Sequence, residues 1–73
     1  MKPFQYKAEQ LNYMLQTEGW KILDEHLQNK RMQAVEVFLK TRDERKLGIV
    51  DGIDALYGEI NFIQNQAIIE KKT

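Results

Sequence analysis

Three carboxylates, Asp51, Asp54 and Glu59, fall close together in the second half of this 73-residue chain. On a helix, residues three apart share a side, so Asp51 and Asp54 would be neighbours. A pair of neighbouring carboxylates can carry general acid–base chemistry only in a cleft and beside a second catalytic group. The surrounding sequence indicates a simple helix with neither, so it predicts a solvated acidic face.

The sequence offers few residues for metal binding or nucleophilic catalysis. The chain contains no cysteine and a single histidine, His26, which stands beside Leu27 at the edge of an apolar stripe. Thiolate and histidine-rich metal sites are therefore excluded. The sequence contains no Ser/His/Asp or Cys/His set and no glycine-rich phosphate loop. We expect no catalytic residue, no metal and no cofactor, and thus not an enzyme.

A cluster of basic residues near the middle of the chain is the best candidate for phosphate contact. Its members are Lys40, Arg42, Arg45 and Lys46. Asp43 and Glu44 offset half of this charge, and no aromatic residue interleaves for base stacking. The 11 basic and 11 acidic side chains cancel over the whole chain, whereas nucleic-acid-binding domains usually show a basic excess. The pattern favours a solvated turn over a nucleic-acid site.

Apolar residues at helical spacing predict two long helices that would position these groups. Thr17 is a plausible N-cap for the first. The run Thr41-Arg42-Asp43-Glu44 resembles a capping box, which would start the second. We therefore predict an all-α antiparallel helical hairpin over residues 17–73. Residues 1–16 form either an N-terminal arm or a short helix, for which Pro3 suits the first turn. The alternative, one continuous rod, would span about 75 Å.

Two glycines in the second predicted helix, Gly48 and Gly52, lie four residues apart and hence on one face. In one interpretation Gly48 ends a short helical turn and Asp51 caps the main helix. In the other, which we favour, both glycines allow the close approach of another helix.

The apolar face of the second helix is too wide for one partner helix to cover. A chain this small, without disulfides, usually needs further association to be stable. We therefore expect a homo-oligomer or a protein partner. The residues predicted to form its interface are Trp20, Leu27, Phe38, Ile49, Leu56, Tyr57 and Ile63.

Four short segments carry a family resemblance. They are Gly19-Trp20-Lys21-Ile22-Leu23, Leu27, Val35-Glu36-Val37-Phe38-Leu39 and Gly52-Ile53-Asp54-Ala55-Leu56. Together they resemble the small helical-hairpin proteins encoded among the head and packaging genes of tailed bacteriophages. The sequence departs from that pattern where Asp51 and Asp54 replace common basic residues and where a short proline-containing tail is missing.

The residues and the resemblance together predict a non-enzymatic helical interaction protein of phage type. It would self-associate or dock on a larger assembly, such as a virion or its assembly machinery. One alternative is a small phage-type effector that binds and inhibits a host protein. A second is a nucleic-acid-binding regulator that uses the basic turn.

The location of the protein follows from what the chain lacks. No apolar run approaches the roughly 18 residues of a membrane span, and the start lacks the apolar core of a signal peptide. We expect the host cytoplasm or the virion, without secretion by a signal peptide. We expect neither a membrane partner nor a small-molecule substrate.

Overall fold

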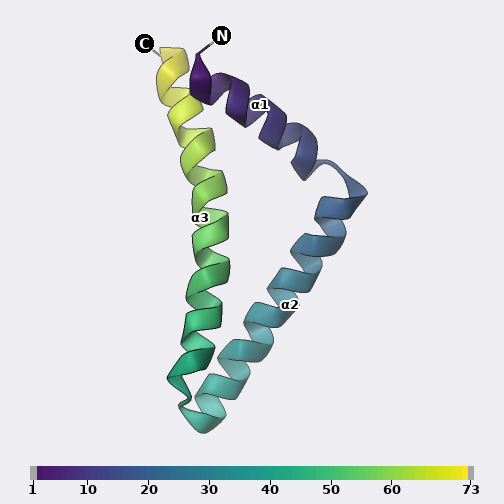
Figure 1. The fold of residues 1–73 in the computed structure, drawn as a ribbon, viewed down its shortest axis with the longest axis vertical. Helices are drawn as coiled ribbons and strands as arrows, with labels where there is room; N and C mark the ends of the chain where they lie inside the picture. Colours follow the sequence, from purple (N-terminus) through teal and green to yellow (C-terminus); the bar gives the residue numbers. More distant parts are fainter. Residues whose placement is uncertain (1, 73) are drawn as a thin grey trace.

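The computed structural model describes residues 2–72, which form three α-helices joined by two short turns (Figure 1). Helix α1 spans Pro3–Leu15, α2 spans Glu18–Thr41 and α3 spans Glu44–Lys72. Within the described residues there is no strand, and the predicted all-α class is confirmed. Of the two possibilities for the N-terminal segment, a short helix is the one formed.

The first turn forms where the sequence predicted it. Pro3 stands at the start of α1, where its missing N–H costs no helical hydrogen bond. Thr17 is the N-cap of α2, since its Oγ1 accepts from the backbone N–H of Trp20 at 3.1 Å. The same hydroxyl donates to the carbonyl of Met14 at 2.7 Å. One side chain therefore joins the end of α1 to the start of α2, and the predicted cap is confirmed.

The second turn breaks the chain at the predicted place but by a different device. Thr41 still belongs to α2, and its Oγ1 donates to the carbonyl of Val37 at 2.8 Å. Arg42 then adopts a left-handed backbone, with φ 58°. Asp43 caps α3, because its Oδ1 accepts from the backbone N–H of Arg45 at 3.1 Å. The capping box over residues 41–44 was therefore a wrong prediction.

The left-handed backbone of Arg42 explains why Asp43, and not Thr41, caps α3. The backbone N–H of Arg42 donates to the carbonyl of Phe38 at 2.7 Å, which closes the end of α2. A residue in the left-handed conformation cannot continue the helix and commonly ends it. The residue after it, Asp43, is then the first with a side chain free to face the new helix.

Most contacts between helices involve α3, which packs against both α1 and α2 (Figure 1). Helix α2 lies against the half of α3 that follows the second turn and diverges from it further on. Helix α1 closes the triangle against the other half of α3, so the two ends of the chain lie together. The Cα atoms extend over 49 × 27 × 13 Å. Viewed down the shortest of these axes, no helix covers another, so the three helices form a single layer (Figure 1).

A single layer allows only a thin core. Of the described residues, four are buried: Ala8 in α1, Ala34 in α2, and Val50 and Ile53 in α3. Two of them are alanines, which lets the helices approach each other at these points. No large side chain among the described residues is fully buried. Each helix contact is therefore open to solvent on both sides of the layer.

The glycines of α3 do not bring this chain's own helices together. Helix α3 runs without interruption through Gly48 and Gly52, so the interpretation of a short turn ended by Gly48 and capped by Asp51 is wrong. A Cβ atom built at either glycine would meet nothing within 4 Å. No other part of the described chain approaches there. Close approach by the helix of a partner stays a prediction.

Candidate interaction surface

The contact between α2 and α3 includes a bidentate ion pair. The Arg31 Nε donates to Asp54 Oδ1 at 2.7 Å, and its Nη2 donates to Oδ2 at 3.2 Å. This hydrogen bonding and the opposite charge lower the pKa of Asp54 and raise the pKa of Arg31. Both side chains remain about half exposed. An exposed pair contributes little free energy, so its main effect is to fix the register of the two helices.

A second polar contact lies further along the same two helices. The rings of Trp20 and Tyr57 meet edge to face, with centroids 6.1 Å apart. The hydroxyl of Tyr57 donates to Asp24 Oδ1. Burial, then this hydrogen bond and the charge of Asp24, raise the pKa of Tyr57. Tyr57 and Trp20 therefore bridge α2 and α3 near the start of α2, where the two helices have already diverged (Figure 1).

The contact between α1 and α3 is held at the free ends of both helices. Glu70 Oε1 accepts from the backbone N–H of Gln5 at 2.9 Å, in the first turn of α1. Lys2 Nζ donates to the Glu70 carbonyl at 2.7 Å. A carboxylate at a helix N-terminus satisfies a free N–H and complements the helix dipole. The Phe4 and Phe62 rings also pack edge to face, with centroids 5.9 Å apart. Glu70 thus caps α1 from the far end of the chain.

The residues predicted as a partner interface fall into two groups. Leu56 is 42% exposed and faces solvent. The other six are half-buried within the described fold: Trp20, Leu27, Phe38, Ile49, Tyr57 and Ile63. Each of these presents part of its surface to solvent because the layer has no cover. Their role toward a partner stays a prediction.

The basic residues of the second turn do not form one open patch. Arg45 donates through Nε and Nη2 to the carboxylate of Asp43, each at 3.1 Å. This pairing lowers the pKa of Asp43. The Arg42 guanidinium lies over the Phe38 ring, 5.6 Å from its centroid. Lys46 is half-buried. Among these four residues, Lys40 alone is exposed with no ion pair or ring contact described for it. The structure therefore scatters these four side chains, and their contact with phosphate stays a prediction.

The acidic residues are similarly dispersed. Asp51 and Glu59 are exposed, and Asp54 is held by Arg31. Within residues 2–72, no group of three or more histidine or acidic residues gathers where it could hold a metal ion. No helix in this part of the chain is long and apolar enough to cross a membrane.

A groove of about 920 Å³ runs between α1 and α3. Ala8 and Ala67 lie at its base, and the amide side chains of Asn12 and Gln64 meet across it at 3.3 Å. Its ionisable lining residues, Glu9, Tyr13 and Lys71, are exposed. Catalytic acids and bases usually have a desolvated setting, so this groove favours no particular reaction.

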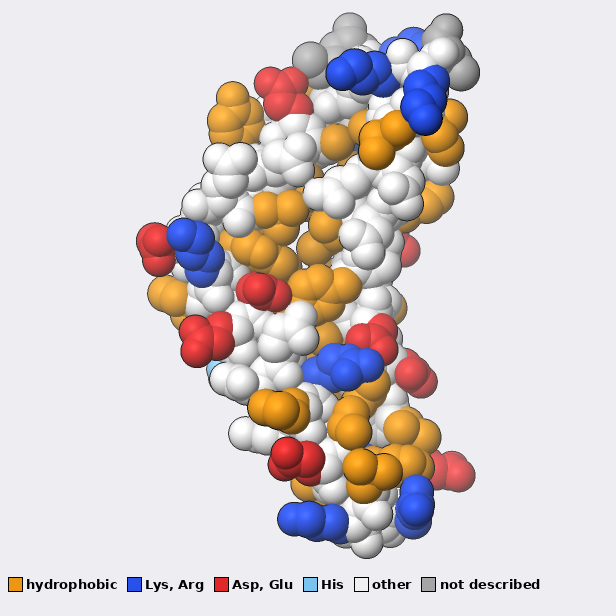
Figure 2. Space-filling view, turned by 180° about the vertical axis from the view of Figure 1, so that it is seen from behind, with side chains coloured by type: hydrophobic (Ala, Val, Ile, Leu, Met, Phe, Trp, Pro, Cys, Tyr) orange, Lys and Arg blue, Asp and Glu red, His pale blue; other side chains and the backbone are white. Residues whose placement is uncertain are grey.

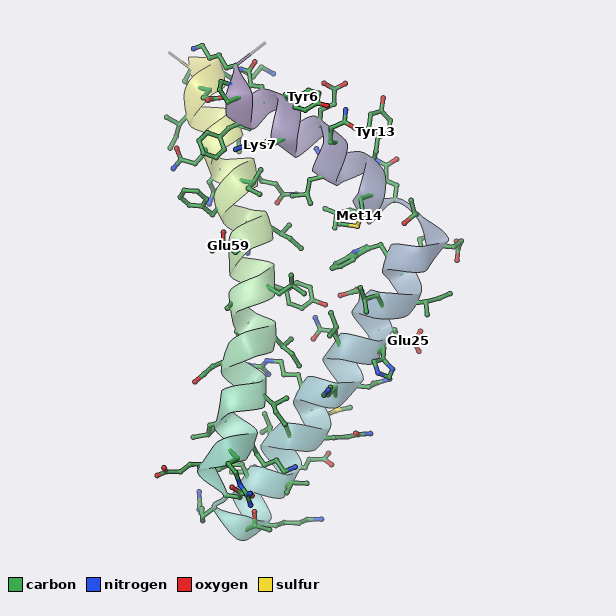
Figure 3. The ribbon with its side chains drawn as sticks, in the orientation of Figure 1. Tyr6, Lys7, Tyr13, Met14, Glu25 and Glu59 are labelled. Atoms are coloured by element: carbon green, nitrogen blue, oxygen red, sulfur yellow. The ribbon has the colours of Figure 1, made fainter. Side chains whose placement is uncertain are left out.

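Large apolar side chains exposed to solvent are the most extensive feature of the surface. Figure 2 shows hydrophobic side chains along the whole length of one broad face, with charged groups scattered among them. Over the whole described surface, exposed large apolar side chains occur on all three helices: Tyr6, Tyr13, Met14, Ile22, Leu23, Met32, Val37, Leu39, Leu47, Leu56, Phe62, Ile68 and Ile69. Figure 3 shows Tyr6 and Tyr13 on the outer side of α1. Sequence reasoning placed the excess of apolar side chains on α3, whereas the structure extends it to α1 and α2.

The interhelix polar contacts were not foreseen from the sequence. Arg31 pairs with Asp54 across 23 positions, Asp24 with Tyr57 across 33, and Gln5 with Glu70 across 65. No local pattern marks partners this far apart. An acidic residue near the end of a helix, such as Glu70, looks unfavourable for its own dipole. That anomaly is the one sequence signal that indicated a role elsewhere.

Comparison of the chain with protein-family models, with curated proteins and with solved structures finds no match.

Proposed function

We propose that this chain is a non-enzymatic helical interaction protein that self-associates or docks on a larger assembly. The single observation that supports this proposal is the open layer, only 13 Å deep across its Cα atoms, in which no large side chain of residues 2–72 is fully buried. The phage virion or its assembly machinery is the setting that the sequence resemblance implies.

The free energy left in the uncovered surface favours association. Fully burying one large apolar side chain is worth roughly 1.5–3 kcal/mol. Leu56, Phe62, Ile68 and Ile69 are all exposed on α3 alone. Even partial cover over a few of them would supply several kcal/mol, which is a large share of the stability of a small domain. Large apolar side chains left exposed in a small protein are available to form an interaction site.

In this proposal the antiparallel helical hairpin is formed by α2 and α3, and α1 closes its open end. The ion pair between Arg31 and Asp54 holds the two long helices in register. The side of α3 that faces away from α2 then remains for a partner.

Sedimentation velocity over a wide range of protein concentrations, together with affinity capture from phage-infected cells, tests the proposal. We expect the chain either to form oligomers or to be recovered with one defined assembly. Leu56→Lys should weaken that association, because it places a charge on an exposed apolar position. Gln33→Lys adds the same charge at an exposed polar position of α2 and should have no effect. A chain that stays monomeric and recovers no assembly contradicts the proposed function.

A further inference from the structure

We propose that the partner on the outer side of α3 is a second copy of this chain. The two α3 helices would cross in an antiparallel sense at Gly52, with Arg45 of each copy facing Glu59 of the other. This inference rests on the proposed function and names its partner.

Arg45, Gly52 and Glu59 share one side of α3, because they are spaced by seven residues, or about two turns. Ile49 and Leu56, also seven apart, lie beside them and supply apolar surface. Asp54, which pairs with Arg31 of α2, stands two residues from Leu56. It is therefore rotated by about 200° from Leu56 around the helix axis. The described contacts with α2 thus leave this side of α3 open. Figure 3 shows Glu59 on the side of α3 that faces away from α2.

The open side of α3 allows a second helix to come close. Gly48 and Gly52 carry no side chain, and the space beyond each of them is empty to at least 4 Å. Packed helices usually lie 8–10 Å apart, depending on the side chains at the contact. Glycines at the crossing point permit the short end of this range, where Ile49 and Leu56 of both copies would lose contact with water.

The order of residues around Gly52 is self-complementary in an antiparallel pair. Positions at equal distances before and after the crossing point face each other. Gly48 lies four residues before Gly52 and Leu56 four after it, so each Leu56 would fill the space over the glycine of the other copy. Arg45 lies seven before and Glu59 seven after. A two-fold axis repeats every such contact, as in most homodimers.

Charge favours this pairing and opposes the parallel one. The Arg45 side chain is 90% exposed, and Asp43 engages two of the five guanidinium N–H groups. Three donors therefore remain for a carboxylate of the second copy. Glu59 is exposed, and no ion pair is described for it among residues 2–72. A parallel pair would instead place Arg45 against Arg45 and Glu59 against Glu59, and like charges in contact oppose association.

Disulfide cross-linking tests the crossing point, since the natural chain contains no cysteine. Gly52→Cys should form a covalent dimer under mild oxidation, because the two Cα atoms at the axis would lie within disulfide range. Gly58→Cys is the matched control, as it is also a glycine of α3 with open space around it. It stands six residues from Gly52, about 120° away around the helix. We expect it to remain monomeric under the same oxidation.

Charge reversal, read by sedimentation equilibrium of the full chain, tests the ion pairs. Glu59→Arg and Arg45→Glu should each weaken dimerisation about tenfold, because two symmetric contacts become repulsive. The double variant carrying both changes should restore it. Circular dichroism of each variant checks that helicity is retained.

Two outcomes would overturn this inference. One is a dimer that cross-links equally through Gly58→Cys or ignores the charge reversals, which would place the self-association on another face and leave the proposed function standing. The other is a natural chain that stays monomeric at high concentration, in which case the proposed function depends on recovery of a different assembly.

Discussion

Tyr57 shows how one side chain takes part in several interactions within a thin core. Its ring packs on Trp20, its hydroxyl donates to Asp24, and the residue is half-buried. Burial is the main cause of its raised pKa, and the bond to Asp24 adds to the effect. The neutral phenol is therefore the form that the fold prefers.

This preference predicts a loss of stability in alkali. A group whose pKa is raised by folding stabilises the native state fully below its unfolded pKa, about 10 for tyrosine. That contribution is lost as the pH rises through the higher folded value. Urea unfolding at a series of alkaline pH values should therefore show a steeper loss in the natural chain than in Tyr57→Phe. Tyr13→Phe, at an exposed position, should keep the steep loss; equal slopes in all three chains would contradict the assignment.

At the scale of the element, the turn between α2 and α3 depends on one carboxylate. Asp43 accepts hydrogen bonds from the backbone and the side chain of Arg45, and both bonds lower its pKa. The Thr41 hydroxyl donates to the Val37 carbonyl in α2 and accepts from the backbone N–H of Asp43, which precedes α3. The start of α3 and the direction in which it leaves the turn are thus set by Asp43.

We expect Asp43→Ala to lower the free energy of unfolding by about 1 kcal/mol, the usual cost of losing an N-cap. Thr41→Ala should cost less, because it removes no bond to the N–H groups of α3. The difference between the two variants should shrink in acid, since a carboxylate with a lowered pKa stabilises the fold above its unfolded pKa and loses that effect as the pH falls through its folded value. Urea titration at neutral and acidic pH measures both effects. A larger loss of stability in Thr41→Ala than in Asp43→Ala would show that Thr41 is the N-cap of α3.

At the scale of the whole molecule, the docking of α1 on α3 closes the triangle. Ala8 is buried in that contact, Glu70 caps the start of α1, and Phe4 meets Phe62. The Cα radius of gyration is 15.6 Å. Because α1 makes few contacts with α2 beyond the turn, its position depends on α3.

A long charged side chain at position 8 should therefore open the triangle. We expect Ala8→Lys to raise the radius of gyration measured by small-angle scattering, at a concentration where the chain is monomeric. Most of the helicity should persist in circular dichroism, because α2 and α3 keep their own contacts. Tyr13→Lys carries the same charge on an exposed position of α1 and should leave the radius unchanged. An unaltered radius in Ala8→Lys would show that α1 is held by other contacts.

The helices and the breaks between them follow from local features of the sequence. Helical spacing of apolar residues, Thr17 as a cap and a break near residues 40–44 are local features, and each was predictable because its cause lies within a few residues. The excess of apolar surface on α3 followed in the same way. The exact cap of α3 did not, since it depends on the left-handed backbone of Arg42.

Only the tertiary structure decided how the helices meet. It placed α1 on α3 as a third side, paired Arg31 with Asp54 and used Glu70 to cap α1, across separations of 23 and 65 residues. Such partners are selected by the packing of whole helices, which no local pattern encodes. It also decided that the layer stays open, because three helices that share one plane have no second layer to cover their apolar faces.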